Sequence, residues 1–287
     1  MANLLLTDLD NTLYNWVDYF APSFRGMVHA ISRELDVDEN DLMQDFKNVY
    51  GKFGSLEFSF TIQELDICKS LDERRIGELI YLGKTVFDMV RTKNLRPYKG
   101  VKETLNWCIQ NNIIVIGVTN APLFHAKMRL KELYLDNFFY GLAAWEGNNF
   151  ENKKFTEKIN KRNIAGKYNT RIKNEWSLSE DRIKPNSYVY QKIINDINFT
   201  YDNIYVVGDS ISKDLAPSIK IGAKTIWAKY GLEFEQKNLD TLLKITPWNL
   251  QGVQTAYVEK KIAPDFIINS FSEIEQIIPK VQLNLFD

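Results

Sequence analysis

The sequence predicts an α/β protein, in which an open parallel sheet carries an additional all-helical segment. Two observations predict this fold class. Short, continuous runs of Val, Ile and Leu alternate along the chain with stretches whose apolar residues follow helical spacing. A block between residues 15 and 95 breaks the alternation, because it shows helical spacing and no convincing strand pattern. We therefore expect a layered core with a helical subdomain inserted near its start.

Six runs have the length and composition of strands. They are continuously apolar, as in "ANLLLT" and "IIVIGVT", and this pattern is typical of strands covered on both faces. The predicted strands are residues 2–7, 113–119, 141–145, 203–208, 223–228 and 265–269.

Helical patterns separate these strands, at residues 101–110, 126–133, 187–197 and 212–221. A strand, a helix and a second strand in succession form a right-handed crossover, so the strands are expected to run parallel. This succession predicts a Rossmann-like open sheet with helices on both faces.

The block at residues 15–95 predicts three helical regions. Apolar residues recur at helical spacing between Phe20 and Leu35 and again between Leu42 and Phe53, and a third region spans Ile62–Val90. "LRPYKG" then returns the chain to the sheet. We thus predict a core formed by residues 1–14 and 96–287, and an all-helical domain at 15–95.

Two further insertions are predicted within the core, at residues 146–181 and 233–261. The first is polar and contains many Lys and Asn residues. A nucleic-acid contact is one interpretation, but few aromatic residues accompany the basic ones, so a solvated insertion is favoured. The second has a partly helical pattern and no role that the sequence reveals.

The composition excludes several classes of protein. The net charge of −1 demands no polyanionic partner, so no nucleic acid is expected, and no apolar run approaches the length of a membrane span. The two cysteines, Cys68 and Cys108, lie far apart. With no secretory signal pattern at the start, they indicate a cytoplasmic protein without a zinc site. Phosphate-binding G-x-x-x-x-G-K-[ST] and dinucleotide-binding G-x-G-x-x-G motifs are absent.

Polar residues follow three of the predicted strands. Asp8 and Asp10 follow the first, Thr119 and Asn120 end the second, and Asp209 begins "DSISKD", which ends in Asp214. Ligands of open parallel sheets bind beyond the carboxyl ends of the strands, so these side chains are expected to meet. Lys184, in "RIKPNSY", lies before a helix that can reach the same edge.

Alone, "DLDNT" at residues 8–12 is equally consistent with a turn or a helix cap. Together, the carboxylates at one edge would repel one another unless a cation neutralised them. With oxygen ligands and only two histidines in the chain, Mg²⁺ is the natural cation. Beside a hydroxyl, backbone N–H groups and a lysine, such an ion makes a phosphate site, where one carboxylate attacks phosphorus and another carries the proton.

Four motifs closely resemble those of the haloacid dehalogenase-like hydrolase superfamily, over residues 4–278. They are "DLDNT" after a first strand, "VTN" after a second, "KP" before a helix, and "GDSISKD" after a further strand. "LRPYKGVKETLNWC" and "KIGAKTIWAKYG" are similar to the segments that follow the family's cap and its metal motif. The inserted helices match the helical cap of that family, which closes over the site and selects the substrate.

The resemblance implies a role for each motif residue. Asp8 would be the nucleophile that forms an aspartyl-phosphate, and Asp10 the acid/base whose backbone carbonyl helps hold Mg²⁺. Thr119 and the N–H of Asn120 would bind the phosphoryl oxygens, and Lys184 would neutralise charge. The metal ligands would be Asp8, Asp10, Asp209 and Asp214, with Asp214 alternatively orienting Lys184.

The same resemblance predicts the reaction. Dehalogenating members lack the second Asp of the first motif, so Asp10 favours phosphoryl transfer. We expect a Mg²⁺-dependent phosphatase acting on a small phosphorylated metabolite, either a sugar phosphate or a nucleoside monophosphate. A phosphomutase and a non-catalytic binding protein on the same fold are the alternatives. The polar insertion at 146–181 departs from the family pattern just before the lysine motif. Lys173 is therefore the alternative to Lys184 as the lysine of that motif.

The last residues carry a separate motif. Pro279 ends the preceding helical pattern, so residues 281–287 are free to extend. "QLNLF" at residues 282–286 resembles the short peptides with which bacterial proteins bind the replication sliding clamp. Docking on that clamp is the less favoured hypothesis, and a tail packed on its own domain is the favoured one.

Overall fold

The computed structural model describes residues 2–57, 59–147, 169–246 and 262–280. Its centre is a single parallel sheet whose strands lie in the order β4-β3-β2-β1-β5-β6-β7. The strands are β1 (Ala2–Thr7), β2 (Ile113–Pro122), β3 (Gly141–Trp145), β4 (Asn174–Leu178), β5 (Tyr201–Gly208), β6 (Lys224–Ala228) and β7 (Phe266–Ile268). The predicted α/β fold class is confirmed.

The central strand is buried on both faces, as its continuous apolar run predicts. Leu4 and Leu6 pack on one face with residues of α7 (Tyr188–Asp196). Leu5 packs on the other face, in a core that includes Leu105 of α4 (Val101–Gln110). Helices α5 (Leu123–Glu132), α8 (Ala216–Ser218) and α11 (Ile274–Ile277) complete the layers. Burying apolar side chains on both faces supplies the main stabilisation of such a sheet.

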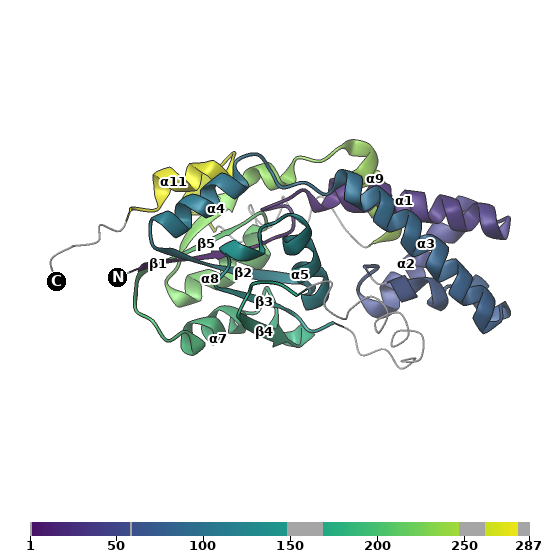
Figure 1. Cartoon of the computed structure of the whole chain (residues 1–287), viewed down its shortest axis with the longest axis horizontal. Helices are drawn as coiled ribbons and strands as arrows, with labels where there is room; N and C mark the ends of the chain where they lie inside the picture. The colour runs from purple at the N-terminus through teal and green to yellow at the C-terminus, as the bar shows by residue number, and fades with distance from the viewer. Residues whose placement is uncertain (1, 58, 148–168, 247–261, 281–287) are drawn as a thin grey trace.

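The described residues between β1 and α4 are mainly helical. They form α1 (Trp16–Leu35), α2 (Glu39–Phe53), two 3₁₀ segments at Ser59–Glu64 and Asp66–Ser70, and α3 (Glu73–Asn94). Asn15 and Asp38 cap the first two helices, with side chains that accept backbone N–H bonds. Figure 1 shows these helices extending from the end of the sheet at which β1 and β2 finish.

Helix α9 (Gln236–Ile245) lies beside α1, although more than 200 residues separate the two in sequence. Arg25 of α1 donates hydrogen bonds to Thr241 and Asn238 of α9, at 2.8 Å each. The predicted insertion at 233–261 is thus helical at 236–245, and its remainder from 247 lies outside the described residues. The hydrogen bonds of Arg25 thus join the helical segment to the part of the core that follows β6.

The structure corrects the prediction for residues 146–181. This region contains strand β4, which pairs with β3 and forms one edge of the sheet. Its alternating exposed and half-buried residues, "NEWSL", lack the continuous apolar run of a central strand, which is why the sequence did not reveal it. Residues 148–168 of the predicted insertion lie outside the described residues.

The predicted helix at 212–221 is also different in detail. It consists of a π-helical turn (Ile211–Leu215), the short α8 and a 3₁₀ turn (Ile219–Ile221). Pro217 lacks the N–H that a regular helix needs, and Gly222 ends the segment in the left-handed conformation. The irregular turn holds Asp214 against the end of β5.

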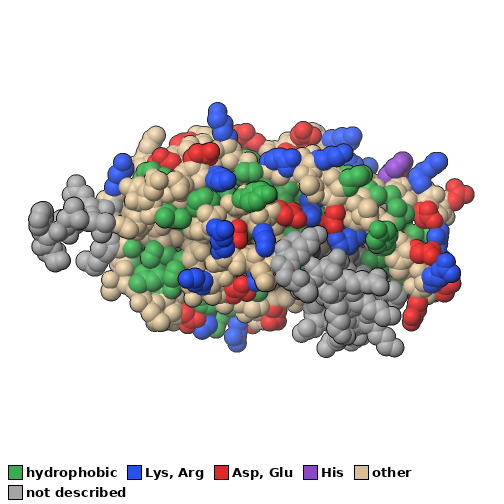
Figure 2. All heavy atoms as spheres, in the orientation of Figure 1, with side chains coloured by type: hydrophobic (Ala, Val, Ile, Leu, Met, Phe, Trp, Pro, Cys, Tyr) green, Lys and Arg blue, Asp and Glu red, His purple; other side chains and the backbone are tan. Residues whose placement is uncertain are grey.

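Two remaining predictions concern the surface. None of the helices in the described part of the chain is long and apolar enough to cross a membrane. Acidic and basic side chains are interspersed over the described surface on the face that Figure 2 shows. The tail at 281–287, with its clamp-like peptide, lies outside the described residues, so sliding-clamp docking stays a prediction.

Candidate active site

Asp8 lies directly beyond the carboxyl end of the buried strand β1, at the edge of the sheet. Its backbone N–H donates to the carbonyl of Val207 on the neighbouring strand β5, at 2.9 Å. The residue is 8% exposed. The hydroxyl of Thr12 donates to Asp8 Oδ2 at 3.5 Å, while the same Thr12 oxygen accepts the backbone N–H of Asp209 at 3.1 Å. The "DLDNT" loop is thus tied to the loop after β5.

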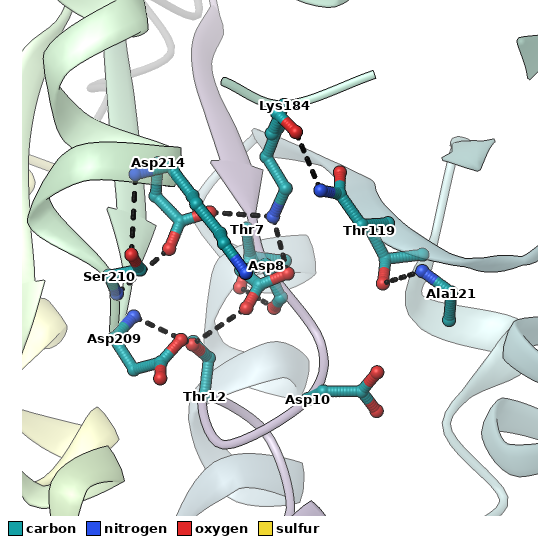
Figure 3. Close-up of polar contacts among 12 residues, drawn as sticks. Thr7, Asp8, Asp10, Thr12, Thr119, Ala121, Lys184, Asp209, Ser210 and Asp214 are labelled. Atoms are coloured by element: carbon teal, nitrogen blue, oxygen red, sulfur yellow. Dashed lines mark hydrogen bonds and ion pairs between the residues drawn. The ribbon is translucent and has the colours of Figure 1, made fainter. Parts of the chain in front are cut away.

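Lys184 joins two of the predicted carboxylates. Its Nζ lies 2.6 Å from Asp8 Oδ1 and 2.6 Å from Asp214 Oδ1, as Figure 3 shows. Its carbonyl oxygen accepts a hydrogen bond from the Asn120 side chain at 2.6 Å. The alternative, Lys173, is exposed, precedes β4 and has no place in this cluster. The structure therefore brings Lys184, and not Lys173, to the carboxylates.

Three carboxylates meet at this edge of the sheet. Oxygen atoms of Asp8, Asp209 and Asp214 all lie within 4.8 Å of one another, close enough to hold one metal ion. Asp214 is fixed by the backbone N–H of Ser210, which donates to its Oδ2 at 2.9 Å. Gly208 permits this approach, because a Cβ there would lie 2.4 Å from the Asp214 carboxyl group. A buried set of carboxylate oxygens is the donor set that Mg²⁺ prefers.

The charges of the cluster are only partly balanced. Burial raises the pKa of Asp8 to about 7; the Lys184 charge opposes this shift, whereas Asp214 adds to it. Burial, with the charges of Asp8 and Asp214, also raises the pKa of Asp209 well above its usual value. Burial alone would lower the pKa of Lys184, but the charges of Asp214 and Asp8 outweigh it and raise that pKa. The single charge of Lys184 does not balance three carboxylates, and a divalent cation would supply the remaining positive charge.

Thr119 and Asn120 lie at the end of β2, facing the same cavity. Thr119 is 3% exposed, and its Oγ1 accepts the backbone N–H of Ala121 at 3.1 Å, so its own O–H is left to donate. The cavity has a volume of about 470 Å³. All seven residues predicted for the site line it: Asp8, Asp10, Thr119, Asn120, Lys184, Asp209 and Asp214.

The side chain of Asp10 lies apart from the carboxylates of Asp8, Asp209 and Asp214. Its carboxyl group points away from Asp8 and Lys184 (Figure 3), and Arg129 of α5 donates to its Oδ1 at 2.6 Å. It is also not one of the three carboxylates that could share a metal ion, which leaves only its backbone carbonyl for the metal role predicted for it. Burial raises the pKa of Asp10, and the Arg129 guanidinium opposes that shift.

Many of the other residues that line the cavity are apolar, and the sequence did not reveal how they are brought together. Its lining comes from α1, α2 and the loop after α2, from β3, and from the segment around α9. The apolar and aromatic lining residues are Trp16, Phe20, Tyr50, Leu56, Trp145, Leu232, Phe234, Leu239 and Leu243. The rings of Trp16 and Phe20 are stacked, with centroids 4.6 Å apart. The same cavity thus contains both the carboxylates with Lys184 and a group of apolar side chains.

Comparison with known proteins agrees with the motifs. A family model described as haloacid dehalogenase-like hydrolase matches residues 2–222. A second, described as HAD-hydrolase-like, matches residues 182–274. The resemblance inferred from the motifs is thereby confirmed.

Individual relatives are distant. The chain is 19% identical to a glyceraldehyde 3-phosphate phosphatase of Pyrococcus furiosus, over 79% of this chain and 81% of that protein. A HAD phosphatase from Thermococcus onnurineus has a similar structure, with a TM-score of 0.56 and 14% identity over 99% of this chain and all of that one. A putative HAD-hydrolase of Bacillus subtilis bound to magnesium has a TM-score of 0.50 and 13% identity, over 96% of this chain and 98% of that one. At these identities the structures show the shared fold alone.

Proposed function

Since the chain belongs to the haloacid dehalogenase-like hydrolases, we propose that it is a Mg²⁺-dependent phosphatase that hydrolyses a small phosphate monoester through Asp8. The observation that carries the proposal is the position of the Asp8 carboxylate, which lies in a cavity beside Lys184 and two further carboxylates. Such an arrangement suits an attack on phosphorus, because a nucleophile and the groups that neutralise the transferred phosphoryl charge lie together.

The proposed reaction has two steps. In the first, an Asp8 oxygen attacks phosphorus, the bond from phosphorus to the leaving oxygen breaks, and Asp10 gives that oxygen a proton. In the second, Asp10 takes a proton from water as the water oxygen attacks phosphorus, which releases inorganic phosphate and restores the Asp8 carboxylate. Lys184, the Thr119 hydroxyl and the Asn120 N–H would hold the phosphoryl oxygens.

The residues present fit a magnesium ion. Asp8, Asp209 and the backbone carbonyl of Asp10 would hold it, Asp214 would either bind it or orient Lys184, and the three carboxylates already converge. When bound, the ion would offset the repulsion among these carboxylates and draw negative charge from the phosphoryl oxygens. A magnesium-bound relative of the same fold supports this choice of metal.

We further propose that residues 15–95 act as a cap over a core formed by residues 1–14 and 96–287. Helix α1 begins immediately after the Asp8 loop, and Trp16, Phe20 and Tyr50 face the cavity that holds the phosphate site. Substrate entering this cavity would place its phosphate against the sheet and its organic group against the helices.

The lining of the cavity favours one of the two predicted substrate classes. A sugar would need several hydrogen-bonding partners for its hydroxyl groups, whereas the lining residues that α1, α2 and α9 contribute are aromatic and aliphatic. A flat nucleobase can pack against Trp16 and the leucines of α9. We therefore favour a nucleoside monophosphate or another monoester with a flat, weakly polar group.

The two cysteines are both free thiols, which supports a reducing, cytoplasmic setting.

A phosphate-release assay tests the proposal. The protein would be incubated with 4-nitrophenyl phosphate and with panels of nucleoside monophosphates and sugar phosphates, in Mg²⁺ and in EDTA. We expect turnover that needs Mg²⁺, is lost in Asp8→Asn and is faster for the nucleotides. Phosphate release that persists in EDTA would contradict the metal role. A protein that binds phosphate esters without releasing phosphate would be the non-catalytic alternative.

A further inference from the structure

Arg129 lies at the inner side of α5 with its guanidinium between two carboxylates. It is 1% exposed, and its Nη1 donates to Asp10 Oδ1 at 2.6 Å. Its Nη2 donates to Glu57 Oε1, and its Cζ lies 5.7 Å from the centre of the Tyr19 ring. A buried arginine is costly to desolvate, so a site that holds one between two acids and over a ring depends strongly on those partners.

The second carboxylate belongs to the proposed cap. Glu57 lies in the loop after α2 and lines the cavity, and its Oε1 also accepts the indole N–H of Trp16 at 2.6 Å. Asp10, Arg129, Glu57 and Trp16 thus form a continuous chain of hydrogen bonds. The chain begins in the loop that carries Asp8, passes through the core helix α5 and ends in the helical segment.

The orientation of Asp10 suits the leaving-group side of the reaction. In phosphoryl transfer, the attacking and leaving oxygens lie on opposite sides of phosphorus, roughly in line. An acid that protonates the leaving oxygen must therefore face away from the nucleophile, as Asp10 faces away from Asp8 in Figure 3. Since Arg129 donates to Oδ1 of Asp10, the proton would be exchanged at the other oxygen, Oδ2.

We propose that Arg129 is a positioning residue, which holds the Asp10 carboxyl group toward the leaving oxygen and links its position to the cap through Glu57. This inference rests on the proposed phosphatase function, because Asp10 needs an orientation only if it passes a proton to the leaving oxygen and takes one from water. Arg129 itself need not touch the substrate. In the first step, its effect should be large only where the leaving oxygen needs the proton from Asp10.

The test compares two esters of similar size. 4-Nitrophenyl phosphate has a leaving group that departs without a proton, whereas the benzyl alcohol leaving from benzyl phosphate needs one. Arg129→Lys keeps a charge but lacks the two terminal nitrogens with which Arg129 reaches Asp10 and Glu57 separately. We expect it to lower the single-turnover rate of alcohol release from benzyl phosphate about 10²-fold, and that of 4-nitrophenol release less than about fivefold, because this step precedes the attack by water that Asp10 also assists.

A double-mutant cycle shows whether Arg129 acts through Asp10. Asp10→Asn alone should show the same dependence on the leaving group, and adding Arg129→Lys to it should cost no further activity on benzyl phosphate. Equal losses on the two esters, or losses that multiply in the double variant, would overturn the positioning role. If the wild-type protein hydrolysed neither ester, the phosphatase proposal itself would have failed, which is a distinct outcome.

Arg91 provides the matched control. It too is a buried arginine, 4% exposed, and is paired with Glu132 and Asp88 away from the cavity. Arg91→Lys should weaken folding without any dependence on the leaving group. If Arg129→Lys does not fold, Glu57→Gln keeps Arg129 and removes the charge of its second partner. It should then lower the single-turnover rate of alcohol release from benzyl phosphate at least about threefold more than that of 4-nitrophenol release; equal effects would again overturn the proposal.

Discussion

Nζ of Lys184 lies 2.6 Å from Oδ1 of Asp8, and both side chains are almost fully buried. The two residues are 176 positions apart in sequence, yet the sheet brings the end of β1 beside the segment that leads into α7. The same ammonium group pairs with Asp214, so one cation is shared by two carboxylates. Lys184 is therefore expected to contribute both to the stability of the protein and to the proposed reaction.

Replacing Lys184 should therefore harm both properties. Lys184→Met would leave the buried Asp8 and Asp214 without their counter-ion, and we expect the free energy of unfolding to fall by about 3–5 kcal/mol. The kcat should fall roughly 10²–10³-fold, because a group that neutralises the transferred phosphoryl charge is lost. Denaturant unfolding and steady-state kinetics measure the two effects. Lys173→Met is the control, since the exposed Lys173 should tolerate the change.

We expect Asp209 to affect the Mg²⁺ concentration that the activity needs. Removing one of the three converging carboxylates takes away a ligand oxygen, so Asp209→Ala should raise the Mg²⁺ concentration for half-maximal activity about tenfold or more. The measurement is a Mg²⁺ titration of phosphate release. Asp202→Ala changes an exposed carboxylate near the start of β5, the strand that precedes Asp209, and should leave the titration unchanged. A shift of equal size in both variants would mean that Asp209 is not a ligand.

The metal-free protein should lose stability as the pH rises. The pKa of Asp8 is about 7 in the folded protein, against 3.8 for an ordinary aspartate, so the folded state holds this proton more tightly than the unfolded state. The stabilisation is complete below about pH 4 and is lost as the pH rises through 7. The raised pKa values of Asp10 and Asp209 act in the same direction.

Magnesium should oppose this loss, because it favours the ionised carboxylates. In thermal unfolding with EDTA, the Tm should be lower at pH 8 than at pH 5.5, and Mg²⁺ should raise it more at pH 8. Asp8→Asn should reduce the difference between the two pH values. An equal increment from Mg²⁺ at both pH values would contradict the assignment of these carboxylates to the ion.

The apolar residues that line the cavity should control substrate preference without taking part in the chemistry. Leu243 lines the cavity and is half-buried, so Leu243→Gln should weaken contact with the organic group. For the preferred substrate we expect KM to rise about 5- to 20-fold with kcat nearly unchanged, which corresponds to burial of one leucine side chain. Inorganic phosphate, which has no organic group, should inhibit the variant and the wild type equally. A selective fall in kcat would instead place Leu243 near the reacting atoms.

Much of the fold could be predicted from the sequence because its strands are buried on both faces. The continuous apolar runs gave six of the strands within three residues at each end. Strand β4 could not be found in this way, since an edge strand alternates between exposed and buried positions. The π-helical turn at 211–215 was missed for a different reason, because its shape depends on contacts of Asp214 and not on apolar spacing.

The site was predictable where its residues follow strands. Asp8, Thr119 and Asp209 lie at strand ends, and parallel strands bring those ends together. Arg129 was not predictable, because its bond to Asp10 joins residues 119 positions apart and its helix shows no motif. The contribution of α9 to the cavity was equally hidden, since it depends on how the segment after β6 packs against α1.

The central claim is that Asp8 is the nucleophile, and the turnover of Asp8→Asn tests it most directly. Asparagine has nearly the same shape as aspartate, so the variant should fold and still bind phosphate esters, but its amide is a poor nucleophile. Steady-state phosphate release would be measured with saturating Mg²⁺ and 4-nitrophenyl phosphate, beside product inhibition by inorganic phosphate to confirm an intact site. We expect a kcat below about 1% of the wild-type value with phosphate binding retained; a folded variant that keeps more than a few per cent of wild-type kcat would contradict the assignment of Asp8 as the nucleophile.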